Sequence, residues 1–225
     1  MANIISLFYH NPVLSRIFPT LVYCLKKELK GCRSVLDLGC GPSSPVEYCR
    51  NIEYSLGVEA HLPYFEETSK KNIHTEYRNE RIEDIDFPEN SFDAVLMLEV
   101  LEHLPEEIAK AVLNKAEKWA RKKVIVSSPN GFLRQGSLDN NYLQAHLSGW
   151  RFKKMIKLGF KCRGLAGLKI LRKEVDADTM GDDLLVSMRF HPKFFWFIIS
   201  CLSQAFVYFV PQSAFELFSV KEVRK

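Results

Sequence analysis

The chain has 225 residues, enough for one domain with a sizeable core, and its 47% apolar and 26% charged residues are ordinary for a folded protein. The net charge of +4 is a mild bias, which fits either solvated helix ends and loops or attraction to phosphates and anionic lipid headgroups. Six cysteines without a C-x-x-C pair argue against a zinc ribbon and suit reduced thiols in the cytoplasm. The first residues lack a basic stretch followed by a long apolar one, so we expect no secretory signal there.

Predicted strands and helices alternate along the first 132 residues. An amphipathic helix is expected over residues 13–30, where leucines recur at helical spacing before a basic tail and Gly31. Short apolar runs predict strands at 34–38, 54–59, 74–77, 92–98 and 123–127, and helices are expected from Pro45, over 63–71 and over 105–121. Strands that are apolar throughout and alternate with helices predict a parallel sheet with helices on both faces.

The pattern changes after residue 132. A helix is expected over 150–158, and strands over 160–164 and 184–190, which would form an antiparallel pair at the edge of the sheet.

The segment Val35-Leu36-Asp37-Leu38-Gly39-Cys40-Gly41-Pro42 carries the most information. Two glycines without a Cβ let a ligand approach the backbone at the end of a strand, and the helix start that follows supplies free N–H groups. A dinucleotide fingerprint would have a third glycine where Ser44 stands, and a carboxylate at Asp37 would repel a pyrophosphate but suit a cationic ligand. Glu59 ends the next strand, where an acidic side chain can accept hydrogen bonds from both ribose hydroxyls.

The chain resembles the class I S-adenosylmethionine-dependent methyltransferases in a series of motifs over roughly residues 30–165. The series runs from the glycine loop through Gly57-Val58-Glu59 and Phe92-Asp93-Ala94-Val95 to Leu98-Glu99-Val100-Leu101-Glu102-His103-Leu104, in order and spacing. The resemblance implies a Rossmann-like α/β fold with a seven-stranded, mostly parallel sheet whose last strand is antiparallel, and S-adenosyl-L-methionine as methyl donor.

The resemblance also implies roles for individual residues. Asp37, Gly39, Cys40 and Gly41 would line the methionine and ribose, Glu59 and Ala60 the ribose hydroxyls, residues 81–84 the adenine, and Leu98 and Glu99 the methionine side. The family often has an Asp where Arg81 stands, and Arg cannot accept a hydrogen bond from the adenine amino group. Glu83 or the backbone is expected to accept that hydrogen bond instead, while Ile82 offers its backbone N–H to the adenine.

His103 and His146 are the candidate catalytic residues. Methyl transfer from a sulfonium needs alignment of donor and acceptor, and a general base helps if the acceptor is a hydroxyl. His103 follows the fourth strand, where it either acts as that base or only shapes the donor pocket. Asn130, after the fifth strand, either holds an acceptor or is a turn residue, and Trp150 is expected to be a core anchor rather than a substrate stacker.

A divalent metal is a further hypothesis. Glu99, Glu102, His103 and the later His146 offer two carboxylates and two imidazoles, a set that suits magnesium, manganese or zinc acting on a hydroxyl. The run E-x-x-E-H is similar to that of ubiquinone-biosynthesis O-methyltransferases, and with His146 and Trp150 it also resembles small-RNA 2′-O-methyltransferases. Many relatives carry the same run with no known metal requirement, so the sequence favours the alternative in which Glu102 and His103 only cap the helix opening at Pro105.

Residues 194–215 contain no charged side chain and lie between Lys193 and the basic residues 221–225. They are interpreted as a helix packed on the domain or in a dimer, as an element on a membrane surface, or, less readily because of Pro211, as a span. We therefore divide the chain into a methyltransferase domain (1–192, with an N-terminal helix 13–30, a donor-binding core 31–132 and an acceptor-side segment 133–192) and a hydrophobic helical extension (193–225).

The sequence predicts a cytoplasmic or membrane-associated methyltransferase acting on a small or lipid-linked acceptor at oxygen. An RNA ribose methyltransferase is disfavoured by the modest charge and the absence of an added RNA-binding motif. A non-catalytic scaffold is disfavoured by the intact glycine loop and Glu59, and a dehydrogenase by Ser44.

Overall fold

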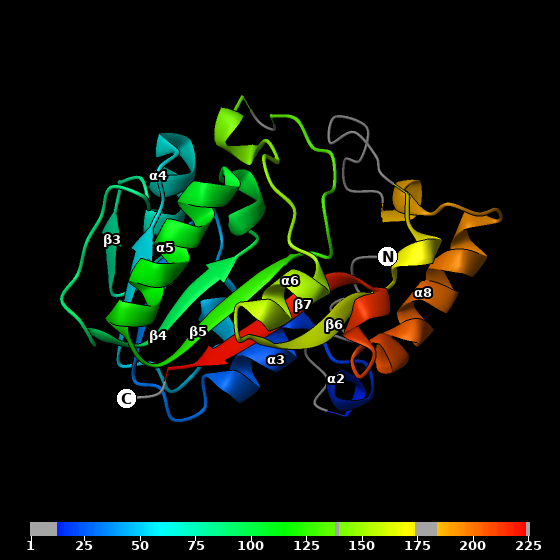
Figure 1. Cartoon of the computed structure of the whole chain (residues 1–225), viewed down its shortest axis with the longest axis horizontal. Coiled ribbons are helices and arrows are strands. Elements are labelled where there is room, and N and C mark those ends of the chain that lie inside the picture. Colours follow the sequence, from blue (N-terminus) through cyan, green and yellow to red (C-terminus); the bar gives the residue numbers. More distant parts are fainter. Residues whose placement is uncertain (1–12, 138–139, 174–183, 224–225) are drawn as a thin grey trace.

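A computed structural model of the chain describes residues 13–137, 140–173 and 184–223. Its centre is a seven-stranded sheet in the order β3-β2-β1-β4-β5-β7-β6 (Figure 1). The strands are β1 (Ser34–Leu38), β2 (Tyr54–Val58), β3 (Glu76–Arg78), β4 (Phe92–Leu98), β5 (Ala120–Pro129), β6 (Lys161–Leu168) and β7 (Ala214–Glu222). Only β7 runs antiparallel to its neighbours β5 and β6, so the seven-stranded, mostly parallel arrangement is confirmed.

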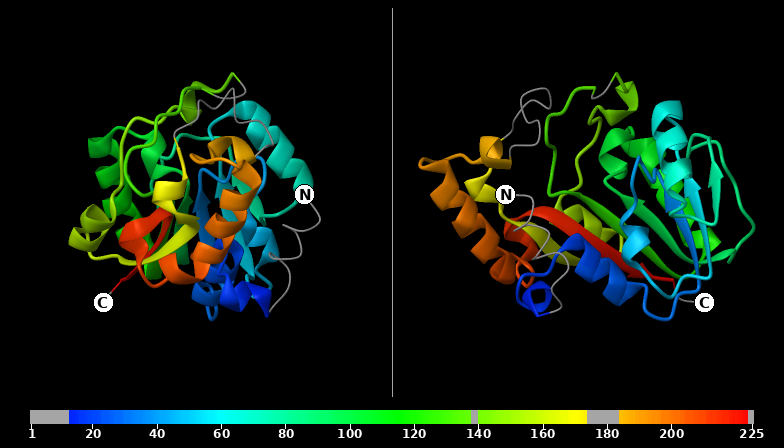
Figure 2. Two further views of the ribbon diagram at one scale, coloured as in Figure 1. Left: turned by 90° about the vertical axis from the view of Figure 1, so that its right-hand side faces the viewer. Right: turned by 180° about the vertical axis from the view of Figure 1, so that it is seen from behind.

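Helices cover both faces of this sheet (Figure 2). They are α2 (Leu14–Ile17), α3 (Leu21–Glu28), α4 (Leu62–Lys71), α5 (Glu106–Trp119), α6 (Phe152–Lys157) and α8 (Lys193–Val207), with 3-10 turns η1 (Pro45–Tyr48), η2 (Leu101–His103), η3 (Tyr142–Gln144), η4 (Lys169–Leu171), η5 (Leu184–Ser187) and η6 (Pro211–Ser213). Residues that alternate along β1 and β4 enter two separate cores: one packs on α5 and α6, and the other on α3. The central strands β1 and β4 are buried on both faces, and they are apolar apart from Ser34, Asp37 and Asp93.

Three predicted elements differ from the structure. The helix expected over 13–30 is interrupted at Phe18–Thr20, because Pro19 cannot continue the first helix and the Thr20 side chain caps the second one by accepting from the Tyr23 N–H. The helix expected from Pro45 is a single 3-10 turn. The strand expected over 184–190 is the 3-10 turn η5.

The antiparallel partner of β6 is therefore not residues 184–190 but β7. Residues 214–222, assigned from the sequence to the hydrophobic extension, form a strand inside the sheet, between β5 and β6. This strand is buried along most of its length, and its longest run of alternating apolar and polar residues, 218–221, is at the lower limit for predicting a strand.

Helix α8 packs directly against β6. Gly164 and Gly167 allow this approach, since a Cβ on Gly164 would lie 2.2 Å from the Val207 carbonyl oxygen and a Cβ on Gly167 would lie 2.4 Å from that of Ser200. No helix among the described residues is both long and apolar enough to cross a membrane.

Replacing Gly164 with Ala should lower the free energy of unfolding by about 1–3 kcal/mol, because the added methyl group overlaps the α8 backbone. Gly136→Ala is the matched control, since no atom lies within 4 Å of its Cβ position. Thermal and urea unfolding would measure both variants. Equal stability of the two would contradict the packing of α8 on β6.

Candidate active site

The glycine loop after β1 forms a tight bend at the carboxyl end of the sheet. Gly39 and Gly41 have φ of +68° and +61°, and the N–H groups of Gly39 and Cys40 donate to the Val58 carbonyl at 2.8 and 3.0 Å. A Cβ on Gly39 would lie 2.8 Å from Val100 Cγ2. Position 39 therefore excludes other residues on both conformational and steric grounds.

Asp37, in the strand before this bend, is buried and held by two polar side chains. Ser44 Oγ donates to Asp37 Oδ2 at 2.5 Å, and His74 Nε2 lies 3.3 Å from the same oxygen. Ser44, which stands in place of a third glycine, also accepts from the Val46 N–H at the start of η1. Sequence reasoning missed His74; Gly57 makes room for its ring, because a Cβ there would lie 2.5 Å from His74 Cδ2.

Glu59 follows β2 and lies against the glycine bend. Its two carboxylate oxygens accept from the N–H groups of Gly41, at 3.0 Å, and of His61, at 2.7 Å. Burial raises the pKa of Glu59, and these two N–H groups oppose that shift. Asn79 fixes the loop after β2 by donating to the carbonyls of Glu59 and Ala60.

The stretch expected at the adenine forms a turn between β3 and β4. Arg81 Nε donates to Glu83 Oε1 at 2.7 Å, so the Glu83 carboxylate is directed towards Arg81. Ile82 is buried in the core that packs on α5. Leu98, expected at the methionine side, is partly exposed at the end of β4.

Three of the four candidate metal ligands come together on the acceptor side. Glu102, His103 and His146 each offer a ligand atom, and these atoms lie within 4.8 Å of one another. His146 reaches η2 because the backbone after it is tied there: the N–H groups of Leu147 and Ser148 donate to the Glu102 carbonyl at 2.7 and 3.0 Å.

The two imidazoles of this cluster are oriented by backbone carbonyls. His146 Nδ1 lies 2.7 Å from the Leu133 carbonyl oxygen, and His103 Nδ1 lies 3.3 Å from that of Ala145. A carbonyl only accepts, so each Nδ1 carries the proton and each Nε2 keeps its lone pair. Burial lowers the pKa of His103 to about 4 and also lowers that of His146, so both rings are neutral near pH 7.

Glu102 carries a buried carboxylate without a side-chain or backbone donor in the described part of the chain. It is 1% exposed, and neither carboxylate oxygen has a hydrogen-bond partner among the described residues. Burial and the neighbouring Glu99 carboxylate raise its pKa well above the usual value. The capping alternative is wrong, because Pro105 occupies the N-cap of α5 and no side chain caps that helix.

Glu99 adjoins this cluster but lies outside the triangle of the other three ligands. It has a φ of +54°, a left-handed conformation that costs free energy for a non-glycine residue and is typical of functional sites. Its side chain is open to solvent, yet desolvation by the surrounding protein raises its pKa.

A third carboxylate, Glu216, was missed from the sequence. It comes from β7, at the position that pairs with Pro129 of β5, and desolvation and Glu99 raise its pKa while Arg172 opposes the shift. No motif marks it, because its place beside Glu99 depends on the insertion of β7 into the sheet.

Asn130 neither faces a ligand nor acts as a simple turn residue. Its amide nitrogen donates to the carbonyls of Pro211, Gln212 and Ala214, and its oxygen accepts from the Phe152 N–H. It thus ties the end of β5 to the start of β7. Trp150 is fully buried and donates to Ser148 Oγ, as expected for a core anchor.

Comparisons with known proteins agree with this geometry. A family model described as a methyltransferase domain matches residues 36–126, while no curated protein sequence matches the chain. Among solved structures, a SAM dependent methyltransferase from Archaeoglobus fulgidus is 17% identical, over 95% of this chain and 99% of that chain, with a TM-score of 0.54. The methyltransferase domain of bacterial CtHen1-C is 16% identical, over 91% and 97% of the two chains, with a TM-score of 0.53.

Coclaurine N-methyltransferase bound to N-methylheliamine and SAH is 14% identical, over 90% of this chain and 71% of that chain, with a TM-score of 0.55. These identities establish a shared fold, and the family model covers the segment that carries the glycine bend, Glu59 and β4. Residues 36–126 therefore match a methyltransferase domain, and the chain shares the fold of these solved methyltransferases.

Proposed function

We propose that the protein transfers a methyl group to a hydroxyl oxygen of a small or lipid-linked acceptor, with a divalent cation held by Glu102, His103, His146 and the adjoining Glu99. One observation carries the proposal: within the described part of the chain, the buried Glu102 carboxylate has no hydrogen-bond partner, and it lies beside two neutral imidazoles. An unpaired buried carboxylate is costly, and a bound cation offsets that cost.

The donor is assigned to the carboxyl ends of β1 and β2. The bend at Gly39 and Gly41 leaves the backbone open to a ligand, and Asp37 lies two residues before it. A positively charged sulfonium suits this surrounding, and the ribose hydroxyls would donate to Glu59 in addition to its two backbone partners. The adenine would lie by residues 81–84, where the engagement of Glu83 by Arg81 leaves the Ile82 backbone N–H as the expected contact.

The donor set on the acceptor side fits a hard divalent cation. Two carboxylates supply oxygen ligands, two imidazoles supply neutral nitrogen ligands, and backbone carbonyls fix the ring orientation, as second-shell groups do in metal sites. Magnesium or manganese would meet this set, and either would act as a Lewis acid that makes an acceptor hydroxyl easier to deprotonate.

The residues of the chain would mainly align the reactants. Methyl transfer proceeds in line and discharges the sulfonium, so no covalent nucleophile is required. Glu59 and the glycine bend hold the nucleoside, while the loop 145–148, tied to η2 through Glu102, holds the acceptor side at a fixed distance from it. The low pKa of His103 makes it a weak base by itself, which favours a ligand role over the general-base role expected from the sequence.

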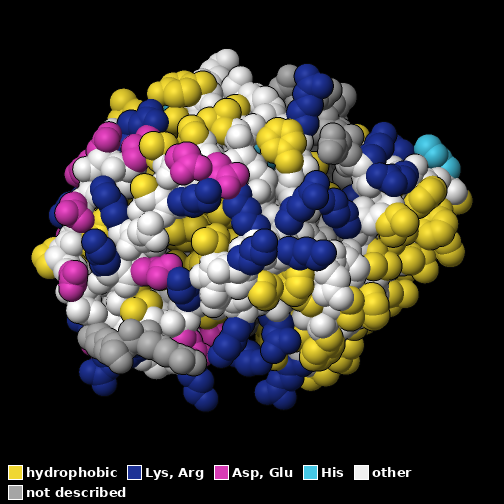
Figure 3. Space-filling model, viewed as in Figure 1, with side chains coloured by type: hydrophobic (Ala, Val, Ile, Leu, Met, Phe, Trp, Pro, Cys, Tyr) yellow, Lys and Arg dark blue, Asp and Glu magenta, His cyan; other side chains and the backbone are white. Residues whose placement is uncertain are grey.

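A ribose hydroxyl of RNA is the second candidate acceptor. An open hollow of about 510 Å³ is lined by Arg151, Lys153, Lys154 and Lys157, with one acidic residue, Glu106, which pairs with Lys154; Figure 3 shows basic side chains gathered on this face. Such a surface suits phosphates. RNA binding that weakens steeply with salt, together with methylated ribose as product, would favour this acceptor over a small or lipid-linked one.

Replacing Gly39 with Ala should weaken the binding of S-adenosylmethionine at least about tenfold, because the new Cβ overlaps Val100 and distorts the bend. Gly31→Ala is the matched control: it has a φ of +83°, lies in open space and is outside the site. Calorimetric titration would compare them. Equal affinities would refute the assigned pocket.

Replacing Glu59 with Ala should cost about 1–3 kcal/mol of binding free energy, the range for a hydrogen bond to a charged group. Glu53→Ala, at an exposed glutamate, is the control. If the ribose contact is correct, the loss should largely disappear for a 2′,3′-dideoxy analogue of S-adenosylhomocysteine. A loss that is the same for both ligands would contradict the contact.

Manganese should raise the melting temperature of the wild-type protein, because it binds the folded state only, and this gain should vanish in Glu102→Gln. Without metal, the same variant should melt no lower than wild type, since it removes a buried unpaired charge. Glu107→Gln, at an exposed residue of α5, is the control. The metal proposal would be contradicted if manganese raised the melting temperature of Glu102→Gln as much as that of wild type. It would also be contradicted if a chelator left the methyltransferase activity unchanged.

A further inference from the structure

Helix α8 exposes a continuous apolar face. Its large exposed side chains recur at helical spacing along one side and continue just past its end; they are Phe194, Phe195, Ile198, Leu202, Phe206 and Phe209, with exposed fractions of 42–73%. Figure 3 shows this face as a band of hydrophobic side chains along the outer side of α8. Large contiguous apolar patches on a protein surface mark interaction sites.

The polar side of α8 faces inward. Gln204 accepts from the Gly167 N–H and donates to the Gly164 carbonyl, and Ser203 Oγ accepts from the Leu168 N–H. The buried side thus uses its polar groups on β6, while phenylalanines face outward. A surface helix of a water-soluble domain normally buries its apolar side and exposes its polar side. The reversed arrangement in α8 indicates an apolar surrounding on its outer side.

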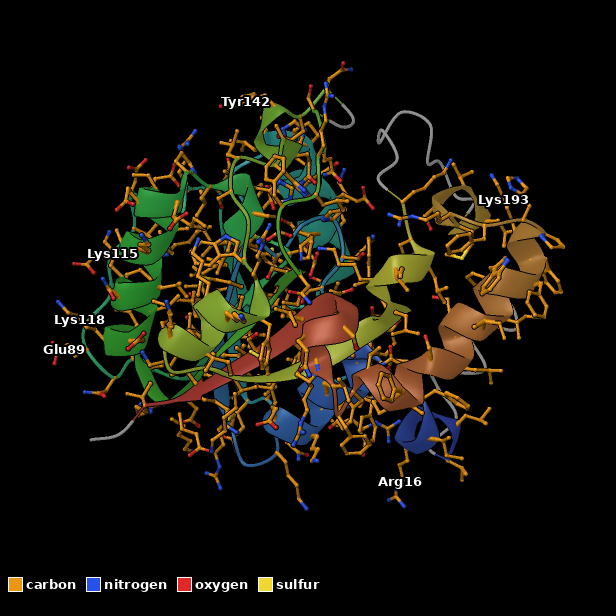
Figure 4. All side chains as sticks on the ribbon, turned by 45° about the vertical axis from the view of Figure 1, so that its right-hand side comes forward. Arg16, Glu89, Lys115, Lys118, Tyr142 and Lys193 are labelled. Atoms are coloured by element: carbon orange, nitrogen blue, oxygen red, sulfur yellow. The ribbon has the colours of Figure 1, made fainter. Side chains whose placement is uncertain are left out.

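The charged residues that the structure describes around this face are basic. The described segments 161–173 and 184–215 contain no Asp or Glu. Lys193 lies at the amino end of α8, and Arg16, on α2, points away from the molecule beside the other end (Figure 4). Exposed Arg189 and Lys173 add to the first end. Residues 174–183 lie outside the described part of the chain and contain five carboxylates. The term cationic rim therefore refers only to the described basic side chains around α8.

We propose that the outer face of α8 docks on an anionic lipid surface, with its phenylalanines in the headgroup–acyl boundary and its flanking cations on the headgroups. A helix lying in the interface needs an apolar face, aromatic residues and basic flanks, and α8 supplies all three. If two copies of the chain joined through this face, their cationic rims would meet, and the described segments contain no negative charges to balance them. Anionic headgroups would supply such negative charges.

Two cations at the amino end of the docked face, Lys173 and Arg189, also line a pocket of about 80 Å³. The rest of its lining is formed by residues 129–133, Lys169, Arg172 and Phe215. Leu133, one of these lining residues, is the residue whose carbonyl orients His146. The pocket would therefore guide an acceptor from the lipid surface towards the cluster, a consequence that rests on the proposed methyl transfer, whereas the docking itself does not.

Vesicle sedimentation of the full chain, without donor or acceptor, tests the docking. We expect the protein to sediment with phosphatidylcholine vesicles containing phosphatidylglycerol, and far less with phosphatidylcholine alone. Phe194→Ser combined with Phe206→Ser should lower the partition coefficient about tenfold or more, from the apolar area lost. Ile108→Ser combined with Ile156→Ser, at exposed positions of α5 and α6, should leave it unchanged.

Tryptophan fluorescence gives a second readout of the same event. Trp119 and Trp150 are 1% and 0% exposed, so a blue shift on adding vesicles would report Trp196, which is partly exposed on α8. The shift should be lost in Trp196→Phe, while sedimentation persists. Thermal unfolding of every variant checks that the fold is intact.

Three outcomes would overturn the proposal. The wild-type protein would stay in the supernatant with both vesicle compositions, or both double variants would lose binding equally. Alternatively, sedimentation equilibrium would reveal a dimer that only the Phe194 and Phe206 variant dissociates, with no vesicle binding. The vesicle assay involves no turnover, so its outcome tests the docking alone. The donor-binding and manganese experiments test the proposed methyl transfer separately.

Discussion

The unpaired carboxylate of Glu102 is the constraint on which the acceptor side depends. A charge buried without a partner is stable only if it is neutralised or faces a cation, and Glu102 has Glu99 and two neutral imidazoles around it. Glu216 adds a further carboxylate to the same edge of the sheet. The fold therefore concentrates negative charge at the place where a sulfonium nucleoside and a divalent cation would bring positive charge.

The rest of the structure holds these groups in place. Glu99 follows the end of β4, and Glu102 and His103 lie in η2. His146, which is 43 residues after His103, lies beside them because the N–H groups of Leu147 and Ser148 bond to η2. Asn130 then ties β5 to β7, which carries Glu216. The same insertion of β7 fixes α8 against β6 and leaves its phenylalanines outward. The C-terminal elements thus supply Glu216 to the acceptor side and form the proposed lipid-facing surface.

The donor side was predictable because its signal is local. Two glycines after an apolar strand, an acidic residue at the next strand end and the β4 motif each act within a few residues, and the structure places them together at the expected edge. The misses involve partners distant in sequence. His74 reaches Asp37 only because Gly57 leaves room, and Asn130 bonds carbonyls more than 80 residues away. Strand β7 begins at the end of the uncharged stretch and was assigned with it to the hydrophobic extension. The metal cluster lies between these cases: its ligands were recognised, but only the folded loop shows that Glu102 lacks a partner.

Diffraction from a crystal grown with manganese and S-adenosylhomocysteine, measured at a wavelength where manganese scatters anomalously, would test this account most directly. It predicts an anomalous peak about 2–2.3 Å from Glu102, His103 and His146, typical of such bonds, with the nucleoside ribose against Glu59. A nucleoside bound elsewhere, or full donor occupancy with no peak beside Glu102, would contradict it.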